Sequence, residues 1–179
     1  LTDVITDDKG EVNGAITQNY KGEYFLYKTQ NIVIASGGIG RAYRNSTNSS
    51  SSTGDGIAAA MRAGAAVKDM EFVQFHPTAL IHPDRNMRFF LISEALRGEG
   101  ALLLNRKGER FMKHHNPLAE LASRDIVSRA IVHEMKKNDL PNVYLNITFK
   151  SREFLQKRFP KIYEACMERG IDIAVNWIP

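Results

Sequence analysis

Residues 71–100 read EFVQFHPTALIHPDRNMRFFLISEALRGEG and place charged and polar side chains in an otherwise apolar stretch. Six polar residues stand out among the apolar ones: Gln74, His76, Ser93, Glu94, Arg97 and Glu99. A charge that leaves water needs a partner, so this much charge in a core-like segment predicts a functional site. The alternative is structural: His76-Pro77 forms an ordinary turn, and Glu94 with Arg97 forms an i,i+3 pair on a helix.

The composition is typical of a soluble globular protein. The 179 residues are 43% hydrophobic and 25% charged, which suits one good core or two parts of larger domains. A single cysteine, Cys166, excludes a disulfide framework. No apolar run approaches the roughly 20 residues of a membrane span, and no signal-peptide pattern occurs. The net charge is +4, but basic and acidic residues alternate, so we expect no nucleic-acid binding.

The first third of the chain predicts a small sheet and then a buried strand. Strand-like segments alternate with turns in a hairpin pattern, at residues 4–5, 12–16 and 24–28, with turns at 7–10 and 20–23. Residues 31–35 (NIVIA) are an unbroken apolar run, which predicts a strand buried on both faces. The glycines of SGGIG follow at 36–40, but they do not open a helix as G-x-G-x-x-G. They are therefore only weak evidence for a dinucleotide site.

Residues 53–66 (TGDGIAAAMRAGAA) predict a helix with a tightly packing face. That face carries residues at helical spacing, namely Ile57, Met61 and Gly64. Asp55 lies in the expected first turn, where two interpretations stay open. It caps the helix and suits the positive end of the helix dipole. Alternatively, Gly54 and Gly56 let a polar ligand approach the helix start, and Asp55 accepts a hydrogen bond from a ligand hydroxyl.

The second half predicts further short elements. They comprise a hairpin over 101–112 that turns at 105–108, a strand at 143–147, and helices over 123–137, 151–158 and 160–169. The adjacent His114 and His115 have no carboxylate at ligand spacing, so no metal site is expected. Cys166 belongs to the apolar side chains of the last helix, and we assign it no chemistry.

Arg124 stands at an unusual place, the first turn of the helix predicted over 123–137. Ser123 before it fits the N-cap position. A cation there meets the positive end of the helix dipole, at a cost of about 0.3–1 kcal/mol. Tolerance at the surface is one explanation, and recruitment to bind an anion is the other.

Six motifs occur in order between Asn31 and Ile131: IVIASGGIG, STGDGIAAAMRAGA, EFVQFHPTAL, SEALRGEGALLLN, GERFM and ELASRDIVSRAI. This series resembles the flavoprotein family of succinate dehydrogenase, fumarate reductase and L-aspartate oxidase. The segment that begins at His133 (HEMKKNDLPNVYLN) is similar to the L-aspartate oxidase branch. The resemblance covers essentially the whole chain but only the middle of the family's proteins, so we expect an internal piece.

The resemblance implies an α+β fold in two parts. Residues 1–72 would be the C-terminal part of a Rossmann-like FAD-binding domain, with β-hairpins, the buried strand and a helix. Residues 73–179 would be an α+β capping domain, truncated at its C-terminal end, that closes over substrate. FAD would be the cofactor, and the residues implied to contact it are Ala35, Ser36, Gly37, Gly38, Gly54 and Asp55.

The resemblance also implies a site for a four-carbon dicarboxylate. His76 would hold one carboxylate, with Gln74 nearby, and Ser93 retains the hydroxyl of the threonine that is usual in the family.

Arg124 matches the arginine proposed to transfer protons in that family. A free guanidinium has a pKa above about 12 and does not readily give up its proton. The family implies a relay from Arg97 through Glu94 to Arg124, in which the proton is replaced as it leaves.

The implied reaction is the oxidation of L-aspartate to iminoaspartate, the first step of NAD biosynthesis. Hydride would pass from the α-carbon to the flavin, with oxygen or fumarate as the electron acceptor. We expect a cytoplasmic protein without a membrane span, with quinolinate synthase acting downstream. Two alternatives stay open: a succinate dehydrogenase or fumarate reductase flavoprotein, and a structural fragment without activity. The isolated chain is expected to be inactive.

Overall fold

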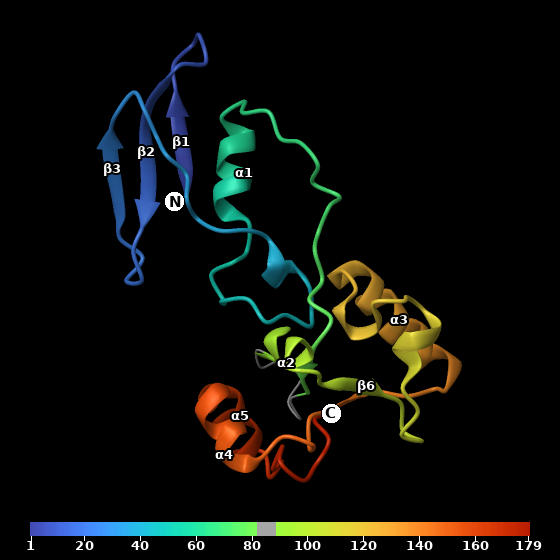
Figure 1. The fold of residues 1–179 in the computed structure, drawn as a ribbon. Helices are drawn as coiled ribbons and strands as arrows, with labels where there is room; N and C mark the ends of the chain where they lie inside the picture. Colours follow the sequence, from blue (N-terminus) through green and yellow to red (C-terminus); the bar gives the residue numbers. More distant parts are fainter. Residues whose placement is uncertain (82–88) are drawn as a thin grey trace. The chain divides into compact units, whose positions relative to one another are not determined.

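The computed structural model describes residues 1–81 and 89–179. The chain divides into two compact units, Leu1–Val73 and Gln74–Pro179, and each is described by itself. Both units mix helices with small sheets (Figure 1), which agrees with the predicted α+β class. The Rossmann-like and capping character of the two parts stays a prediction. Within the described residues, no helix is long and apolar enough to cross a membrane.

The first unit contains a three-stranded antiparallel sheet in the order β1-β2-β3 (Figure 1). Its strands are β1 (Asp3–Thr6), β2 (Val12–Gln18) and β3 (Tyr24–Lys28). Asp7 fixes the first turn, because its carboxylate accepts hydrogen bonds from the amides of Lys9 and Glu11, each at 2.9 Å. Asn19 does the same in the second turn for Lys21 and Glu23. The two predicted hairpins are confirmed, and their turns follow from side chains that replace backbone partners.

The buried strand predicted at residues 31–35 is wrong. The segment forms no strand, and Val33 in its centre is 94% exposed. An apolar run is buried in a sheet only where neighbouring strands pair with it on both sides. Among residues 1–81 and 89–179, no strand pairs with this segment. The segment instead packs against the next helix, through Ile34 and Ser36.

That helix, α1 (Asp55–Arg62), is shorter than predicted and buries a different face. Gly56 and Ala59 are buried, whereas Met61 of the predicted face is 51% exposed. The small residues form the contact because a Cβ on Gly56 would lie 1.9 Å from Ser36 Oγ and 2.9 Å from Ile34 Cγ2. At the far end of the helix, Arg62 Nη2 donates to the carbonyl of Thr2 at 2.7 Å, which ties α1 to the sheet.

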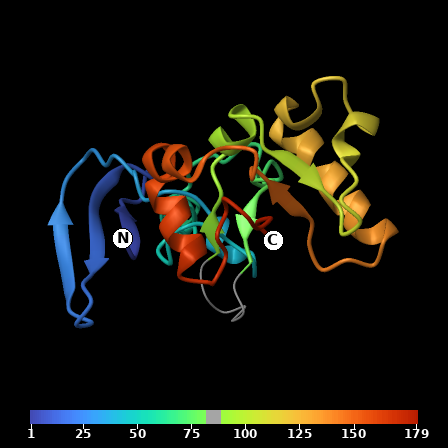
Figure 2. The same ribbon diagram turned by 60° about the horizontal axis from the view of Figure 1, so that its bottom comes forward.

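The second unit contains two small antiparallel sheets surrounded by helices. Its strands are β4 (Ala79–Leu80), β5 (Phe90–Leu91), β6 (Leu102–Leu104) and β7 (Tyr144–Asn146), and its helices are α2 (Ala95–Gly98), α3 (Arg124–Lys137), α4 (Arg152–Arg158) and α5 (Pro160–Met167). β4 pairs with β5, and β6 pairs with β7 (Figure 2). The residues that the structure describes also form three short 3-10 turns: η1 (Gly40–Ala42) in the first unit, and η2 (Phe111–His114) and η3 (Ala119–Leu121) in the second.

The hairpin predicted over 101–112 is confirmed only in its turn. Asn105 and Gly108 close that turn with a 3.0 Å hydrogen bond, but a single bridge, Leu104 to Arg110, continues it. The chain bends into η2 after Arg110, which buries Phe111 and Met112, so β6 takes the distant β7 as its partner. Periodicity cannot distinguish a sequence neighbour from a distant strand as the pairing partner.

The three helices predicted in the second unit are confirmed within the usual uncertainty of helix ends. Ser123 and Asn138 are the caps of α3. Ser151 caps α4 by accepting a hydrogen bond from the amide of Phe154 at 3.2 Å, and Pro160 opens α5. Proline suits this first position because its missing amide hydrogen would have no partner there.

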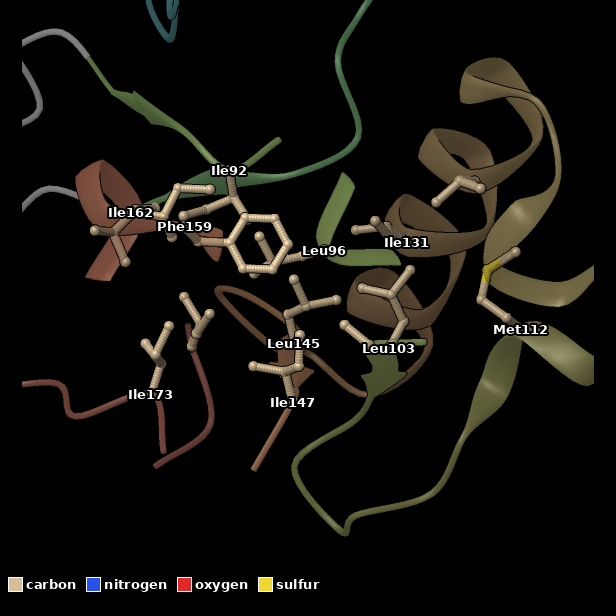
Figure 3. Close-up of a cluster of buried hydrophobic side chains, with 14 of the residues drawn as sticks. Ile92, Leu96, Leu103, Met112, Ile131, Leu145, Ile147, Phe159, Ile162 and Ile173 are labelled. Atoms are coloured by element: carbon tan, nitrogen blue, oxygen red, sulfur yellow. The ribbon is translucent and has the colours of Figure 1, made fainter. Parts of the chain in front are cut away.

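The hydrophobic core of the second unit joins its sheets and helices (Figure 3). Side chains from several elements meet in it, among them Leu96 of α2, Leu103 of β6, Ile131 of α3, Leu145 of β7, Phe159 between α4 and α5, and Ile162 of α5. Leu96 and Leu103 are essentially inaccessible to solvent. The core therefore fixes α2 and α3, the two elements that carry the polar residues considered next.

Candidate functional site

The segment before β4 holds His76 through the backbone of Thr78. The Thr78 amide donates to His76 Nδ1 at 3.3 Å, and the Thr78 carbonyl lies 3.0 Å from the same nitrogen. The two contacts require different tautomers of the ring. When Nδ1 accepts the amide hydrogen, Nε2 carries the ring hydrogen and can donate it to a carboxylate. Thr78 is itself fixed, because its buried hydroxyl donates to the carbonyl of Ile92 at 2.8 Å.

The pKa of His76 lies below its ordinary value. Burial is the largest cause, and it outweighs the hydrogen bond with Thr78, which raises the pKa. The positive charges of Arg124 and Arg97 lower it further. His76 is therefore mainly neutral at pH 7, and it can donate through Nε2 in the tautomer whose Nδ1 accepts the amide hydrogen of Thr78.

Arg124 binds two side chains from other parts of the second unit. Its Nε donates to Glu94 Oε2 at 2.8 Å and its Nη2 to Glu94 Oε1 at 3.1 Å, which is the two-pronged pairing that a guanidinium forms with a carboxylate. Its Nη1 donates to Gln74 Oε1 at 2.8 Å. Ser128, one turn further along α3, donates to the carbonyl of Phe75 at 3.2 Å and holds that segment against α3.

Arg97 extends this pairing toward the interior. Its Nη2 lies 3.6 Å from Glu94 Oε2, in the i,i+3 relation predicted for α2. Only Arg97 is buried, at 4% exposure, whereas the side chains of Glu94 and Arg124 are 48% and 42% exposed. Residues 71–100 were expected to bury several charges, and this expectation is wrong for Glu94. Glu94 precedes the first residue of the short helix α2, where its side chain stays accessible.

The three charged groups differ in how strongly they hold a proton. Hydrogen bonds from Arg124 lower the pKa of Glu94, and the same carboxylate raises the pKa of Arg124. Burial lowers the pKa of Arg97, although the charge of Glu94 opposes this effect. In the described part of the chain, Arg97 Nε has no hydrogen-bond partner, which agrees with its incomplete solvation. Two guanidinium groups against one carboxylate leave the cluster with a positive charge that suits an anion.

Ser93, predicted to contact substrate, accepts a hydrogen bond from the amide of Ala95 at 3.2 Å. The serine thus fixes the start of α2, and its hydroxyl hydrogen can still be donated elsewhere. Its contact with substrate stays a prediction, as do the roles of the other five side chains.

The predicted cofactor residues come together in the first unit. Gly56 lets the segment at Ser36 lie directly against the first turn of α1, as the 1.9 Å approach described above shows. Gly37 and Gly54 have positive φ values of 79° and 84°, which glycine adopts without strain. A Cβ on Gly38 would meet nothing within 4 Å, so the backbone there is open to a ligand.

Asp55 does not cap α1, because Gly54 is the N-cap residue and no side chain makes a capping hydrogen bond. Asp55 Oδ2 instead accepts a hydrogen bond from Thr53 Oγ1 at 2.8 Å and remains exposed. Of the two interpretations of Asp55, the structure therefore excludes side-chain capping.

A profile of the FAD binding domain family matches residues 1–179, which is the whole chain. The chain belongs to the FAD binding domain family. The expected cofactor, FAD, is the one for which this family is named, and the glycine-rich approach between residues 36–38 and the start of α1 fits a site of that kind.

Several members of this family are similar to the chain over most of its length. L-aspartate oxidase of Pseudomonas aeruginosa is 51% identical over 158 residues, which are 88% of this chain and 29% of that protein. L-aspartate oxidase 1 of Ralstonia nicotianae is 47% identical over 183 residues, with 99% of this chain and 34% of that protein covered. The chain thus spans about a third of the length of these relatives.

Solved structures of the family are also similar. The FrdA chain of an E. coli quinol fumarate reductase matches with a TM-score of 0.86 and 35% identity, covering 99% of this chain and 33% of that chain. Sdh1 of Mycobacterium smegmatis, in complex with UQ1, matches with a TM-score of 0.75 and 38% identity, covering 99% of this chain and 30% of that one.

Sequence reasoning missed three features that hold the site in place. Thr78 orients His76, Ser128 anchors the segment before it, and Gln74 contacts Arg124. The contacts of Ser128 and Gln74 join residues about 50 positions apart, and no periodic pattern reveals them. A signal was present only for Gln74, which the resemblance placed near the substrate.

Proposed function

We propose that this chain forms part of an FAD-dependent L-aspartate oxidase, which converts L-aspartate to iminoaspartate. The observation that carries the proposal is the connected series Gln74–Arg124–Glu94–Arg97 in the second unit. It joins side chains from three segments that are distant in sequence, next to a neutral histidine. The identity of 51% and 47% with L-aspartate oxidases supports this substrate over its relatives.

In this proposal, FAD lies against residues 35–38 and the first turn of α1. The open backbone at Gly38 allows close approach, and the exposed carboxylate of Asp55 accepts a hydrogen bond from a ribose hydroxyl. When bound, the flavin accepts the hydride of the substrate α-carbon and passes electrons to oxygen or fumarate.

The dicarboxylate is bound by the positive cluster of the second unit. The Arg124 guanidinium attracts an anion, and His76 donates its Nε2 hydrogen to one carboxylate without carrying a full charge. Ser93 contributes a hydroxyl. A neutral histidine donor beside two guanidinium groups avoids placing a third positive charge in the same small volume.

Arg124 moves a proton, with Glu94 and Arg97 behind it. When fumarate is reduced, one carbon takes a hydride and its neighbour takes a proton, which Arg124 donates. The ionised Glu94 carboxylate takes a proton from Arg97 and passes it to Arg124, so the proton that Arg124 loses is replaced as it leaves. Burial lowers the pKa of Arg97, which makes this guanidinium the better proton donor to Glu94.

A second candidate is a succinate dehydrogenase or fumarate reductase flavoprotein. The TM-score of 0.86 with a quinol fumarate reductase chain supports it, because the same cluster would serve succinate and fumarate.

The two candidates differ in their place in metabolism. The proposed oxidase acts at the start of NAD biosynthesis in the cytoplasm, and its product is consumed by quinolinate synthase. The second candidate instead passes electrons to a quinone.

Steady-state turnover of the full-length protein distinguishes the two candidates. We expect oxidation of L-aspartate with either oxygen or fumarate as acceptor, and slow or no oxidation of succinate. Quinone-dependent oxidation of succinate without turnover of L-aspartate would establish the second candidate instead. The two acceptors, tested separately, show which of them the enzyme uses.

A further inference from the structure

Glu120 is a buried carboxylate of the second unit that lies close to Arg97. Its side chain is 4% exposed, and it precedes the Arg124 helix by only four residues. It begins the ELASRDIVSRAI motif, and its partner Arg110 lies in the GERFM motif, yet neither has a role in the site described above. A buried carboxylate must be matched by donors or it destabilises the fold.

The Glu120 carboxylate is fully engaged. Arg110 donates to it through Nε at 3.0 Å and through Nη2 at 2.5 Å, and the amide of Leu103 donates at 3.1 Å. Burial by itself raises the pKa of Glu120, but the hydrogen bonds from Arg110 and Leu103 outweigh it and lower the pKa. Glu120 therefore stays charged. Its carboxylate is held between the amide of Leu103 in β6 and the guanidinium of Arg110, which precedes η2.

The backbone of Glu120 serves a different partner. Its carbonyl accepts a hydrogen bond from Arg97 Nη1 at 2.5 Å. The preceding residue, Ala119, has a φ of 46°, a left-handed conformation that a residue with a Cβ adopts only where its surroundings hold it there. With Nη1 fixed by this carbonyl, Nη2 is the nitrogen that faces Glu94, at 3.6 Å.

We propose that Glu120 and Arg110 are positioning residues that hold Arg97 in register with Glu94 and Arg124. The side-chain pair anchors η3, and η3 presents the Glu120 carbonyl to Arg97. Arg110 pairs with the Glu120 carboxylate through Nε and Nη2, so this side chain is held away from Arg97 and only the Glu120 carbonyl binds it. This inference rests on the proposed function, because it assigns a task within that proton relay.

The test uses the full-length enzyme and the reduction of fumarate, which needs a proton at each turnover. Glu120→Gln removes the charge and keeps the shape. We expect kcat to fall by at least about tenfold while KM for fumarate stays within about threefold, because proton delivery but not binding is impaired. The solvent deuterium isotope effect on kcat should exceed that of the wild type, since proton transfer becomes slower.

Asp172→Asn is the matched control. It breaks another ion pair of the same unit, Arg152 Nη2 to Asp172 Oδ2 at 2.7 Å, which lies outside the relay. We expect this variant to lower the thermal midpoint without changing kcat or the isotope effect. If Glu120→Gln lowers only the thermal midpoint, as the control does, Glu120 is merely structural and the inference is overturned.

Arg110→Lys covers the case in which Glu120→Gln does not fold. Lysine keeps the charge but loses the two-pronged contact that orients the carboxylate. A reduced kcat with unchanged KM supports the inference, and a wild-type kcat overturns it. If the wild-type enzyme oxidises no L-aspartate and reduces no fumarate, the proposed function fails first, and the inference fails with it.

Discussion

At the scale of single residues, the site depends on two cations that differ in their surroundings. Arg124 is half-exposed and paired on two sides, whereas Arg97 is buried and its Nε has no hydrogen-bond partner among the described residues. The residue types and their presence in one site were predictable, because the family resemblance places Arg124, Glu94 and Arg97 in one relay. Their exposure was not, because the apolar neighbours of Glu94 in the sequence do not surround it in the fold.

Arg124→Lys in the full-length enzyme separates charge from geometry. Lysine keeps the positive charge, but it lacks the planar guanidinium that donates to Glu94 and Gln74 at the same time. We expect kcat for fumarate reduction to fall by at least about 10²-fold, the usual contribution of positioned proton transfer. The affinity for dicarboxylate inhibitors should stay within about tenfold of the wild-type value. His76→Asn is the comparison, and it should mainly raise KM, by about 10- to 100-fold. A near wild-type kcat for Arg124→Lys would reduce Arg124 to an anion anchor.

The lowered pKa of His76 predicts a dependence of stability on pH. The folded protein holds fewer protons on this ring than the unfolded chain does, between the lowered pKa and the ordinary value of about 6.5. The contribution of His76 to stability is therefore present above that value and is lost as the pH falls. Urea unfolding of the full-length wild type and His76→Gln should show a difference that shrinks from pH 7.5 to 5.5. A difference that stays constant or grows would contradict the assignment.

At the scale of elements, local chemistry predicted more than strand pairing did. The turns at Asp7 and Asn19 and the proline that opens α5 are set by neighbours in sequence, and all were predictable. Pairing of β6 with β7 joins residues about 40 positions apart, so it is decided by the whole core. The same limit explains why the strand predicted at residues 31–35 is wrong. An apolar run in the sequence does not show whether another strand pairs with it.

Two glycine substitutions test the predicted cofactor site in the first unit. Gly56→Ala brings a Cβ against Ser36 and Ile34, so we expect about 1–3 kcal/mol of destabilisation together with loss of flavin. The Cβ added by Gly38→Ala has no protein atom within 4 Å, so this variant should keep the wild-type unfolding midpoint. It should still lower the flavin content of the full-length enzyme, because the added methyl group would occupy space next to the cofactor. Full flavin content in a stable Gly38→Ala variant would remove residues 35–38 from the cofactor site.

At the scale of the whole molecule, the chain spans about a third of its relatives, and its two units carry different parts of the proposed function. The first βαβ unit, whose glycine turn holds the pyrophosphate in dinucleotide-binding domains, is not among these residues. We therefore expect the isolated 179-residue chain to bind no FAD. Equilibrium dialysis against FAD checks this expectation, and a stoichiometric complex would contradict it.

The most direct test of the account is a single anaerobic turnover of the full-length enzyme. Without an acceptor, electrons that leave the substrate remain on the flavin, whose absorbance then reports the chemical step alone. We predict that L-aspartate bleaches the flavin of the wild type rapidly, that succinate does not, and that iminoaspartate forms in equal amount. Bleaching by succinate with no response to L-aspartate would contradict the account.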